Sequence, residues 1–239
     1  MAEAEDEAGL RARFLAVSTA TLTTALFKRG LRNTFIQDVR PLNPATSRMA
    51  GPAFTLRYIP AREDLDTIKV FENPRHPQRH AVETLPPGRV MVVDSRKDAR
   101  AASAGGILIR RMMVRGAAGF VTDGGLRDSH EIAAMGFPAF CRGASAPTNL
   151  IHHHALDIDV PIGCGDVPVY PGDWIVGDAE GVVVVPSEMA AEIAAEALAM
   201  TAFEDYVEAE VAAGRSIIGL YPPNAETRAE FEAAKGRKG

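Results

Sequence analysis

The residues with the clearest chemical potential begin with two adjacent glycines, Gly105 and Gly106, which stand directly before an apolar segment of helical pattern. The free N–H groups and positive dipole end of a helix starting there would bind a carboxylate or a phosphate. Without Cβ atoms, the two glycines would let such a ligand approach the backbone closely. An ordinary tight turn is the plainer alternative. Neither a Gly-Lys-Ser/Thr sequence nor the third glycine of a dinucleotide fingerprint follows, which excludes both common nucleotide-binding loops.

A second candidate, Arg127-Asp128, follows the glycine pair Gly124-Gly125. An arginine fork binds a carboxylate through two parallel hydrogen bonds, and a neighbouring aspartate can hold a hard divalent cation that keeps several waters. A surface ion pair is the alternative. Glu131, one helical turn later, would hold a metal-bound water or the Arg127 side chain, or would be a solvated first-turn acid. We therefore expect Arg127 and Asp128 to be catalytic, with Asp128 as the metal ligand.

Three further groups of residues are weaker candidates. Lys97, Asp98 and Arg100 either line the same pocket or form a solvated loop. The consecutive histidines 152–154 point in different directions, and this spacing suits structural zinc poorly, so a partly exposed turn or strand is favoured. The two cysteines, Cys141 and Cys164, lack a nucleophile signature and are expected to be core thiols.

The elements around the glycine pairs predict a βαβ unit. Val90–Asp94 is a short apolar run typical of an inner strand. Residues 107–115 form an amphipathic helical pattern ended by Gly116, and Phe120–Asp123 is a second short strand. Because such units usually place ligands at the carboxyl ends of their strands, both glycine pairs are expected at one site.

The flanking segments extend this to an α/β chain. Upstream, we predict a helix over 21–29 that is capped by Ser18 or Thr19, a strand over 53–58, and a polar surface excursion over 60–80. Downstream, we predict strands at 167–169, 174–176 and 182–185, then an alanine-rich helix to about Gly214 with Ser187 as its N-cap. No repeat or linker marks a boundary, so residues 1–239 are expected to form a single domain with helical segments at 1–40 and 187–239.

Composition narrows the class of protein. The chain has 239 residues, 46% of them hydrophobic, and a net charge of -5, which argues against non-specific nucleic-acid binding. Two cysteines are too few for a disulfide framework. The first nine residues lack the pattern of a secretion signal, and no apolar run approaches the roughly 20 residues needed to span a bilayer. We expect a cytoplasmic protein that binds neither nucleic acid nor membrane.

The combined pattern resembles the RraA-like family, which includes class II 4-hydroxy-4-methyl-2-oxoglutarate / 4-carboxy-4-hydroxy-2-oxoadipate aldolases and the RNase E activity regulator RraA. The resemblance rests first on the order of Gly105-Gly106, Arg127-Asp128 and Glu131. Segments 51–55 and 171–186 also match, and the whole resemblance covers roughly residues 18 to 190.

This resemblance implies a swivelling β/β/α fold assembled as homotrimers or homohexamers with sites at subunit interfaces. It implies that Arg127 holds a pyruvate carboxylate and that Asp128 holds Mg²⁺ or Mn²⁺. Backbone amides over Gly105, Gly106, Ile107 and Leu108 would complete the substrate pocket. The aldolases usually carry an aspartate, acting through metal-bound water, where this chain has Gly106.

The expected function is therefore that of a divalent-metal-dependent lyase that cleaves a C–C bond of a small 2-oxo acid, by retro-aldol cleavage or by decarboxylation. A metal-bound water, or a carboxylate such as Glu204 or Glu208 from a neighbouring subunit, would be the base. One alternative is a non-catalytic RraA-type regulator that binds an endoribonuclease. Another is a different sugar-acid or 2-oxo-acid enzyme on the same scaffold.

Overall fold

The longest strand, β2 (Met49–Pro60), lies at the centre of the fold and pairs with three other strands in the computed structural model, which describes residues 6–236. Its first residues pair antiparallel with β12 (Trp174–Gly177), its middle runs parallel to β3 (Val90–Asp94), and its end pairs antiparallel with β9 (His153–Ile158). The predicted strand over 53–58 is thus confirmed and longer than expected, because a different partner supports each part of it.

A parallel core at the middle of the main sheet carries the predicted βαβ unit. The strands follow the order β1-β7-β5-β3-β2-β12-β13, and β2, β3, β5 (Gly119–Thr122) and β7 (Ala139–Cys141) are parallel neighbours. Both faces of β3 are covered: Met91 and Val93 join one hydrophobic cluster, and Val90 and Val92 join another. This two-sided burial explains the continuous apolar runs in the sequence.

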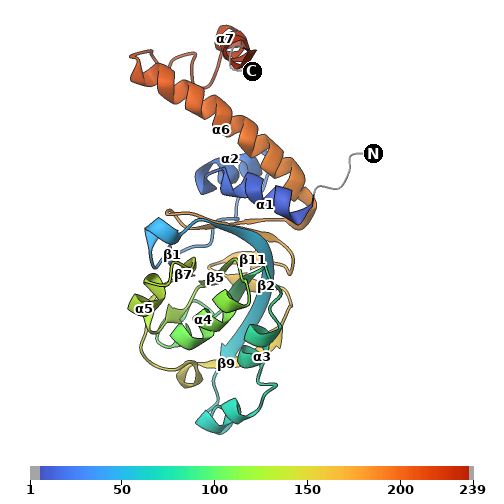
Figure 1. The fold of residues 1–239 in the computed structure, drawn as a ribbon, viewed down its shortest axis with the longest axis vertical. Helices are drawn as coiled ribbons and strands as arrows, with labels where there is room; N and C mark the ends of the chain where they lie inside the picture. Colours follow the sequence, from blue (N-terminus) through green and yellow to red (C-terminus); the bar gives the residue numbers. More distant parts are fainter. Residues whose placement is uncertain (1–5, 237–239) are drawn as a thin grey trace.

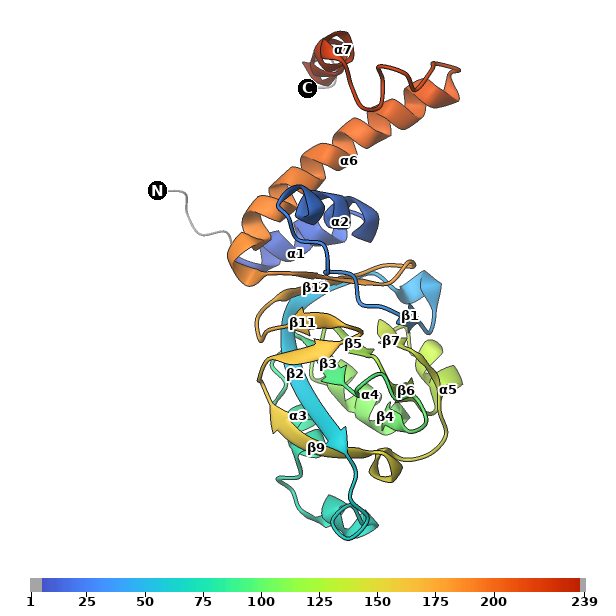
Figure 2. The same cartoon turned by 180° about the vertical axis from the view of Figure 1, so that it is seen from behind.

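Helices cover one face of this sheet and a hairpin covers the other (Figures 1 and 2). The helices are α3 (Pro77–Thr84), α4 (Gly106–Val114) and the short α5 (Ser129–Ala133); the hairpin is β10 (Ile162–Cys164) with β11 (Val167–Val169). A small parallel sheet at the carboxyl ends of the core strands joins β4 (Ala102–Ala104), β6 (Gly125–Leu126) and β8 (Gly143–Ala144). The α/β class is confirmed.

Terminal helices form a separate hydrophobic cluster above the sheet. Helices α1 (Glu7–Leu15), α2 (Thr19–Lys28) and α6 (Ala190–Ala212) pack on β12 and β13 (Val182–Val185). Helix α6 then projects away from the sheet and leads to α7 (Ala225–Gly236) (Figure 1). Residues 1–5 and 237–239 of the two predicted terminal segments lie outside the described residues.

The two predicted helix caps had different outcomes. Ser18 accepts a hydrogen bond from the Thr21 N–H at 3.0 Å and caps α2, as expected. Ser187 as N-cap is wrong: it lies in a 3₁₀ turn (Ser187–Met189), and α6 begins after Met189. The Ser187 N–H instead donates to Asp173 at 3.1 Å, which anchors the turn to the loop before β12.

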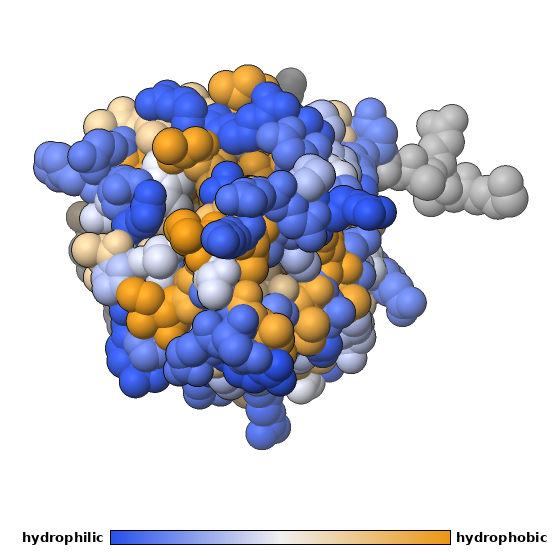
Figure 3. Space-filling view, turned by 90° about the horizontal axis from the view of Figure 1, so that it is seen from below, coloured by the Kyte–Doolittle hydropathy of each residue, from blue (hydrophilic) through white to orange (hydrophobic). Residues whose placement is uncertain are grey.

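Hydrophobic side chains on the end of the molecule opposite α7 form separate patches between hydrophilic ones (Figure 3). None of the helices that the structure describes has the length and apolarity required to cross a membrane.

Candidate functional site

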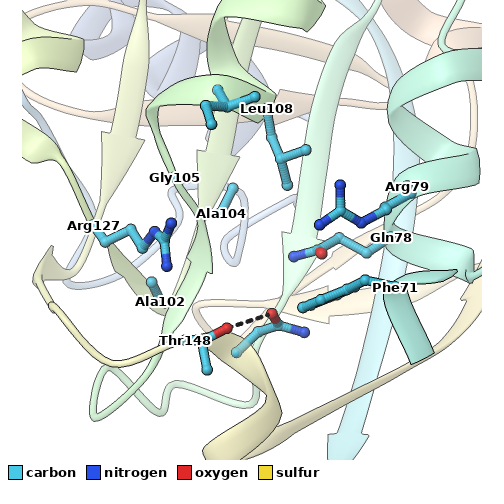
Figure 4. A pocket seen from close by; sticks show the side chains of 11 residues that line it. Phe71, Gln78, Arg79, Ala102, Ala104, Gly105, Leu108, Arg127 and Thr148 are labelled. Carbon is cyan, nitrogen blue, oxygen red and sulfur yellow. Dashed lines mark hydrogen bonds between the residues drawn. The ribbon is translucent and has the colours of Figure 1, made fainter. Parts of the chain in front are cut away.

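A small cavity of about 110 Å³ lies where β4 meets α4, at the predicted ligand-binding edge of the sheet (Figure 4). Four of the expected site residues line it: Gly105, Ile107, Leu108 and Arg127. Its other walls come from residues that share no motif in the sequence: Phe71, Gln78, Arg79, Ala102, Ala104, Thr148 and Asn149. The cavity is open to solvent and lined by both apolar and cationic side chains, which suits a small organic anion.

The N-terminus of α4 forms one edge of this cavity. Gly105 is its N-cap residue, and the Gly105 carbonyl accepts hydrogen bonds from Leu108 at 3.0 Å and Ile109 at 3.1 Å. The Ile107 N–H belongs to the first turn, where no intrahelical acceptor exists, so it remains a donor for a ligand. A Cβ atom on Gly105 would lie 2.7 Å from Arg127 Nε and 2.9 Å from Asp128 Oδ2. A Cβ atom at position 105 would therefore displace the Arg127 and Asp128 side chains from this arrangement, which glycine permits.

The second motif meets the first through Asp128. Its carboxylate oxygen Oδ2 accepts a hydrogen bond from the Gly106 N–H at 2.9 Å and lies 3.5 Å from Arg127 Nε. Asp128 stands immediately before α5 with a left-handed backbone (φ 55°, ψ 34°), yet its side chain makes no cap bond to α5. It caps α4 instead. Gly106 therefore lies beside Asp128 with its N–H occupied, and it is not among the cavity-lining residues.

The Arg127 and Asp128 side chains remain accessible, each 45% exposed. Glu131 is exposed in the first turn of α5. The structure thus brings Gly105, Gly106, Arg127 and Asp128 into direct contact.

Buried hydroxyl groups hold the loops that carry both motifs. The Ser95, Ser103 and Thr122 hydroxyls form a closed ring with oxygen separations of 2.7, 2.7 and 3.2 Å. Gly124 packs against this ring so tightly that a Cβ atom would lie 2.5 Å from Ser95 Cβ. Each partner comes from a different strand end, so the ring ties β3, β4 and β5 together below the site.

Asp123, at the end of β5, anchors the neighbouring loops. Its carboxylate accepts backbone N–H bonds from Ser95, Lys97 and Gly165 at 2.7, 3.1 and 3.1 Å. Burial nevertheless raises the pKa of Asp123 above its ordinary value, because the loss of hydration outweighs these bonds. Asp123 is a structural anchor, since it points away from solvent and is 2% exposed.

One wall of the cavity comes from the segment predicted to be a surface excursion, and that expectation is wrong for its last residues, 76–80. Residues 77–84 form α3, and Gln78 on this helix is buried against the sheet. Gln78 Nε2 donates to the Tyr58 hydroxyl at 3.0 Å and to the Ser103 carbonyl at 2.8 Å. Pro77 at the first helical position was the signal for this helix, but the polar residues around it concealed the buried face.

The weaker candidates lie outside the cavity. Lys97 pairs with Asp166 at 2.7 Å and Arg100 pairs with Asp98 at 2.7 Å, so these residues form a loop of ion pairs. The Arg100 guanidinium holds the pKa of Asp98 well below its ordinary range. Within residues 6–236, no three His, Cys, Asp or Glu side chains are grouped to hold a metal.

The histidines and cysteines serve packing and local bonding. His153 is fully buried and stacks on Tyr58 with ring centroids 5.4 Å apart, and burial lowers its pKa. His154 pairs with Asp66 at 2.7 Å. Cys141 and Cys164 are free and buried, as expected of core thiols.

Comparisons with known proteins cover the part of the chain that forms this site. The model of the family described as RraA-like (Aldolase/RraA) matches residues 19–184. A protein of Halalkalibacterium halodurans named "Putative 4-hydroxy-4-methyl-2-oxoglutarate aldolase" is 36% identical over 178 residues, which cover 73% of this chain and 75% of that protein.

Solved structures show the same fold. The Streptomyces coelicolor protein RraAS2, described as "an unusual member of the RNase ES inhibitor RraA protein family", is 30% identical with a TM-score of 0.76, over 86% of this chain and 98% of that one. An uncharacterized protein from Pseudomonas syringae pv. tomato has the same TM-score at 24% identity, over 89% of this chain and 96% of that one. These neighbours bear out the predicted β/β/α architecture.

Proposed function

Since the chain belongs to the RraA-like family, we propose that it is a lyase that cleaves a C–C bond of a small 2-oxo acid and releases pyruvate. The observation that carries this proposal is the contact of Arg127, Asp128 and the α4 N-terminus at one small cavity. The name of the H. halodurans relative supports an aldolase-type reaction.

Substrate binding follows from the charges at the cavity. The Arg127 guanidinium would hold the 2-oxo carboxylate through its fork, and the Ile107 N–H with the α4 dipole would hold an oxygen of the same group. These donors are fixed before the substrate arrives, because the Ser95–Ser103–Thr122 ring and the Gly105 contact hold both loops. Preorganised donors of this kind stabilise negative charge as it develops in a transition state.

Asp128 fits a role as a single-carboxylate ligand for Mg²⁺ or Mn²⁺. One of its oxygens bonds the Gly106 N–H, and its side chain is 45% exposed beside Arg127, which lines the cavity. Magnesium is commonly held by one or two carboxylates plus substrate oxygens and water, so one aspartate suffices as the protein's share. When bound, such an ion would supply Lewis-acid polarisation of the keto group. Glu131, three residues later and exposed, would contribute through a water.

Cleavage of a 4-hydroxy-2-oxo acid breaks the bond between C3 and C4. The C4 hydroxyl loses its proton and becomes a carbonyl, and the electron pair remains on C3 as the enolate of pyruvate, next to Arg127. A proton on C3 then completes pyruvate. The side chains lining the cavity, as far as the structure describes it, include no carboxylate or imidazole. We infer that the hydroxyl proton leaves to water or to a carboxylate of a neighbouring subunit.

Pyruvate release tests the proposal. Oxaloacetate and 4-hydroxy-4-methyl-2-oxoglutarate would each be incubated with the protein in Mg²⁺, in Mn²⁺ and in EDTA, and pyruvate would be measured enzymatically. We expect turnover with the metals and its loss in EDTA. No pyruvate above the protein-free rate from either compound would exclude the lyase.

The likeness to RraAS2, at 30% identity, supports an RraA-type regulator of an endoribonuclease as the second candidate. Such a regulator would require the fold but would not require a catalytically active cavity. Co-purification of an endoribonuclease, together with no heat of Mn²⁺ binding in calorimetry, would favour the regulator. Mn²⁺ binding that depends on Asp128 would favour the enzyme.

A further inference from the structure

The wall of the cavity facing Arg127 carries a cation of its own, Arg79 on α3. Figure 4 shows the two guanidinium groups reaching toward the space between them from opposite sides. The Arg79 Cζ atom lies 4.3 Å from the centroid of the Phe71 ring, and this cation–π contact holds the guanidinium at the rim. No carboxylate within the described part of the chain forms an ion pair with Arg79. Its charge is thus free for a ligand.

A second group on the same cavity also lacks a partner. Asn149, in the short turn Asn149–Ile151, is 4% exposed and lines the cavity. Its Oδ1 accepts a hydrogen bond from the Thr148 hydroxyl at 3.3 Å, but its buried Nδ2 has no acceptor among residues 6–236. A buried donor without a partner costs roughly 1 to 3 kcal/mol. A ligand oxygen in the cavity would satisfy it.

The helix that carries Arg79 is fixed independently of any ligand. Gln78, the residue before it, bonds the Tyr58 hydroxyl and the Ser103 carbonyl, and Ser103 belongs to the hydroxyl ring below Gly105 and Arg127. The two cationic walls are therefore built on the same buried network. The fold therefore sets the separation of the walls that carry Arg79 and Arg127, and side-chain mobility alone does not determine it.

We propose that Arg79 and Asn149 form a second anion subsite, which selects 2-oxo acids that carry another carboxylate at the far end of the molecule. This rests on the proposed function, in which Arg127 and the α4 N-terminus hold the 2-oxo carboxylate. The far carboxylate would take a charged hydrogen bond from Arg79 and a neutral one from Asn149 Nδ2. Arg79 is thus a specificity-determining residue supplied by the β2–β3 connection.

Two substrates that differ at the far end test the subsite. Retro-aldol cleavage of 4-hydroxy-2-oxoglutarate gives pyruvate and glyoxylate, and cleavage of 4-hydroxy-2-oxopentanoate gives pyruvate and acetaldehyde. Only the first has a second carboxylate, and both are followed by pyruvate release. We expect Arg79→Gln and Asn149→Leu to lower kcat/KM for the first compound, by roughly 10- to 100-fold for Arg79→Gln and less for Asn149→Leu. The values for the second compound should change less than twofold.

Arg110→Gln is the matched control, because Arg110 is an exposed arginine on α4 outside the cavity and the substitution removes the same charge. It should leave the ratio of the two kcat/KM values unchanged. Arg79→Lys should recover part of the preference. If Arg79→Gln lowers kcat/KM equally for both substrates, or for neither, the proposed subsite is wrong.

Binding without turnover separates this proposal from the proposed function. Calorimetry with 2-oxoglutarate and 2-oxobutyrate, in the presence of Mn²⁺, compares a dianion with a monoanion. If the wild-type protein prefers 2-oxoglutarate and Arg79→Gln removes this preference, the subsite is supported. This holds even if the wild-type protein cleaves neither hydroxy acid, a result that would contradict only the proposed lyase activity. An equal preference in the wild type and Arg79→Gln overturns the subsite, even if the lyase is active.

Discussion

Arg127 enters the cavity beside Gly105 with its Nε facing Asp128, so its remaining donors are free for a carboxylate. An ammonium group could not reproduce this planar fork. Arg127→Lys should therefore cost about 2 to 4 kcal/mol of transition-state stabilisation, measured as a fall in kcat/KM for pyruvate release. Arg110→Lys, at an exposed arginine of α4 outside the cavity, is the control. Near-normal kcat/KM in Arg127→Lys would show that Arg127 is structural.

A substitution of Asp128 tests separately whether this residue binds the metal. Asp128→Asn keeps an acceptor for the Gly106 N–H and a residue that tolerates the left-handed backbone. We expect Mn²⁺ dependence to be lost while the free energy of unfolding changes by only about 0.5 kcal/mol. Asp159→Asn is the control, because Asp159 has a similar left-handed φ of 57° away from the cavity. Unchanged Mn²⁺ affinity in Asp128→Asn would contradict the metal role.

The two cysteines should be inert in the folded protein. Burial raises the pKa of Cys141 to about 11, and burial also raises the pKa of Cys164 well above its ordinary value. At pH 8, roughly one Cys141 side chain in a thousand would be a thiolate. A disulfide reagent such as DTNB should modify neither thiol in native protein and both in guanidinium chloride. Rapid native modification would mean that the core around these residues opens.

How far the site could be predicted depends on the type of residue. Gly105, Arg127 and Asp128 were predicted because their two motifs stand at the ligand-binding edge of a predicted βαβ unit. Arg79 and Asn149 were not, because an isolated arginine on a polar helix and an asparagine in a turn are common surface residues. Their importance arises only when distant segments meet at the cavity.

At the scale of elements, the junction between α2 and α6 depends on charge as well as packing. Lys28 at the end of α2 and Arg29, its C-cap residue, both contact Glu196 on α6, and hydrogen bonding to Arg29 lowers the pKa of Glu196. A carboxyl group whose pKa is lower in the folded than in the unfolded state stabilises the fold at pH values above its unfolded-state pKa. This contribution is lost as the pH falls through the folded-state pKa.

Glu196→Gln should therefore cost up to about 1 kcal/mol of unfolding free energy at pH 7, and the difference from wild type should shrink below about pH 4.5. Urea unfolding of both proteins at pH 7 and below about pH 4.5 measures this difference in unfolding free energy. Glu192→Gln is the control, because Glu192 is 76% exposed and lies 3.9 Å from Arg29. A pH-independent difference would contradict the ion-pair explanation.

Strands β3, β5 and β13 were predicted and helix α3 was not, for a physical reason. Strands β3, β5 and β13 are buried on both faces, so their residues are continuously apolar and stand out from their surroundings. Helix α3 buries only Gln78, Ala81 and Val82, and its remaining positions are polar. Its stability comes from contacts with the sheet, which no local pattern records.

At the scale of the whole molecule, the segment between α6 and α7 carries exposed apolar side chains away from the sheet. Ile218 is 87% exposed, and Ile217 and Tyr221 are each more than half exposed. Contiguous exposed apolar residues often mark a protein interface. We expect light scattering to give three or six times the 25.5 kDa chain mass, and Ile218→Asp to weaken that assembly. A single-chain mass for the wild type would contradict the predicted homotrimer or homohexamer.

The position of α3 in the chain has a consequence for how specificity could diverge among related proteins. Helix α3 belongs to the crossover between β2 and β3, which are parallel neighbours whose register is fixed by their own buried side chains. That crossover supplies Phe71, Gln78 and Arg79, whereas Gly105, Ile107 and Arg127, the proposed pyruvate-binding side of the cavity, lie on later segments. One wall of the site can therefore differ between relatives as long as Gln78 and the buried side chains of α3 keep their contacts with the sheet. A chimera that carries residues 61–85 of another family member should keep its chemistry and acquire that relative's choice of substrate.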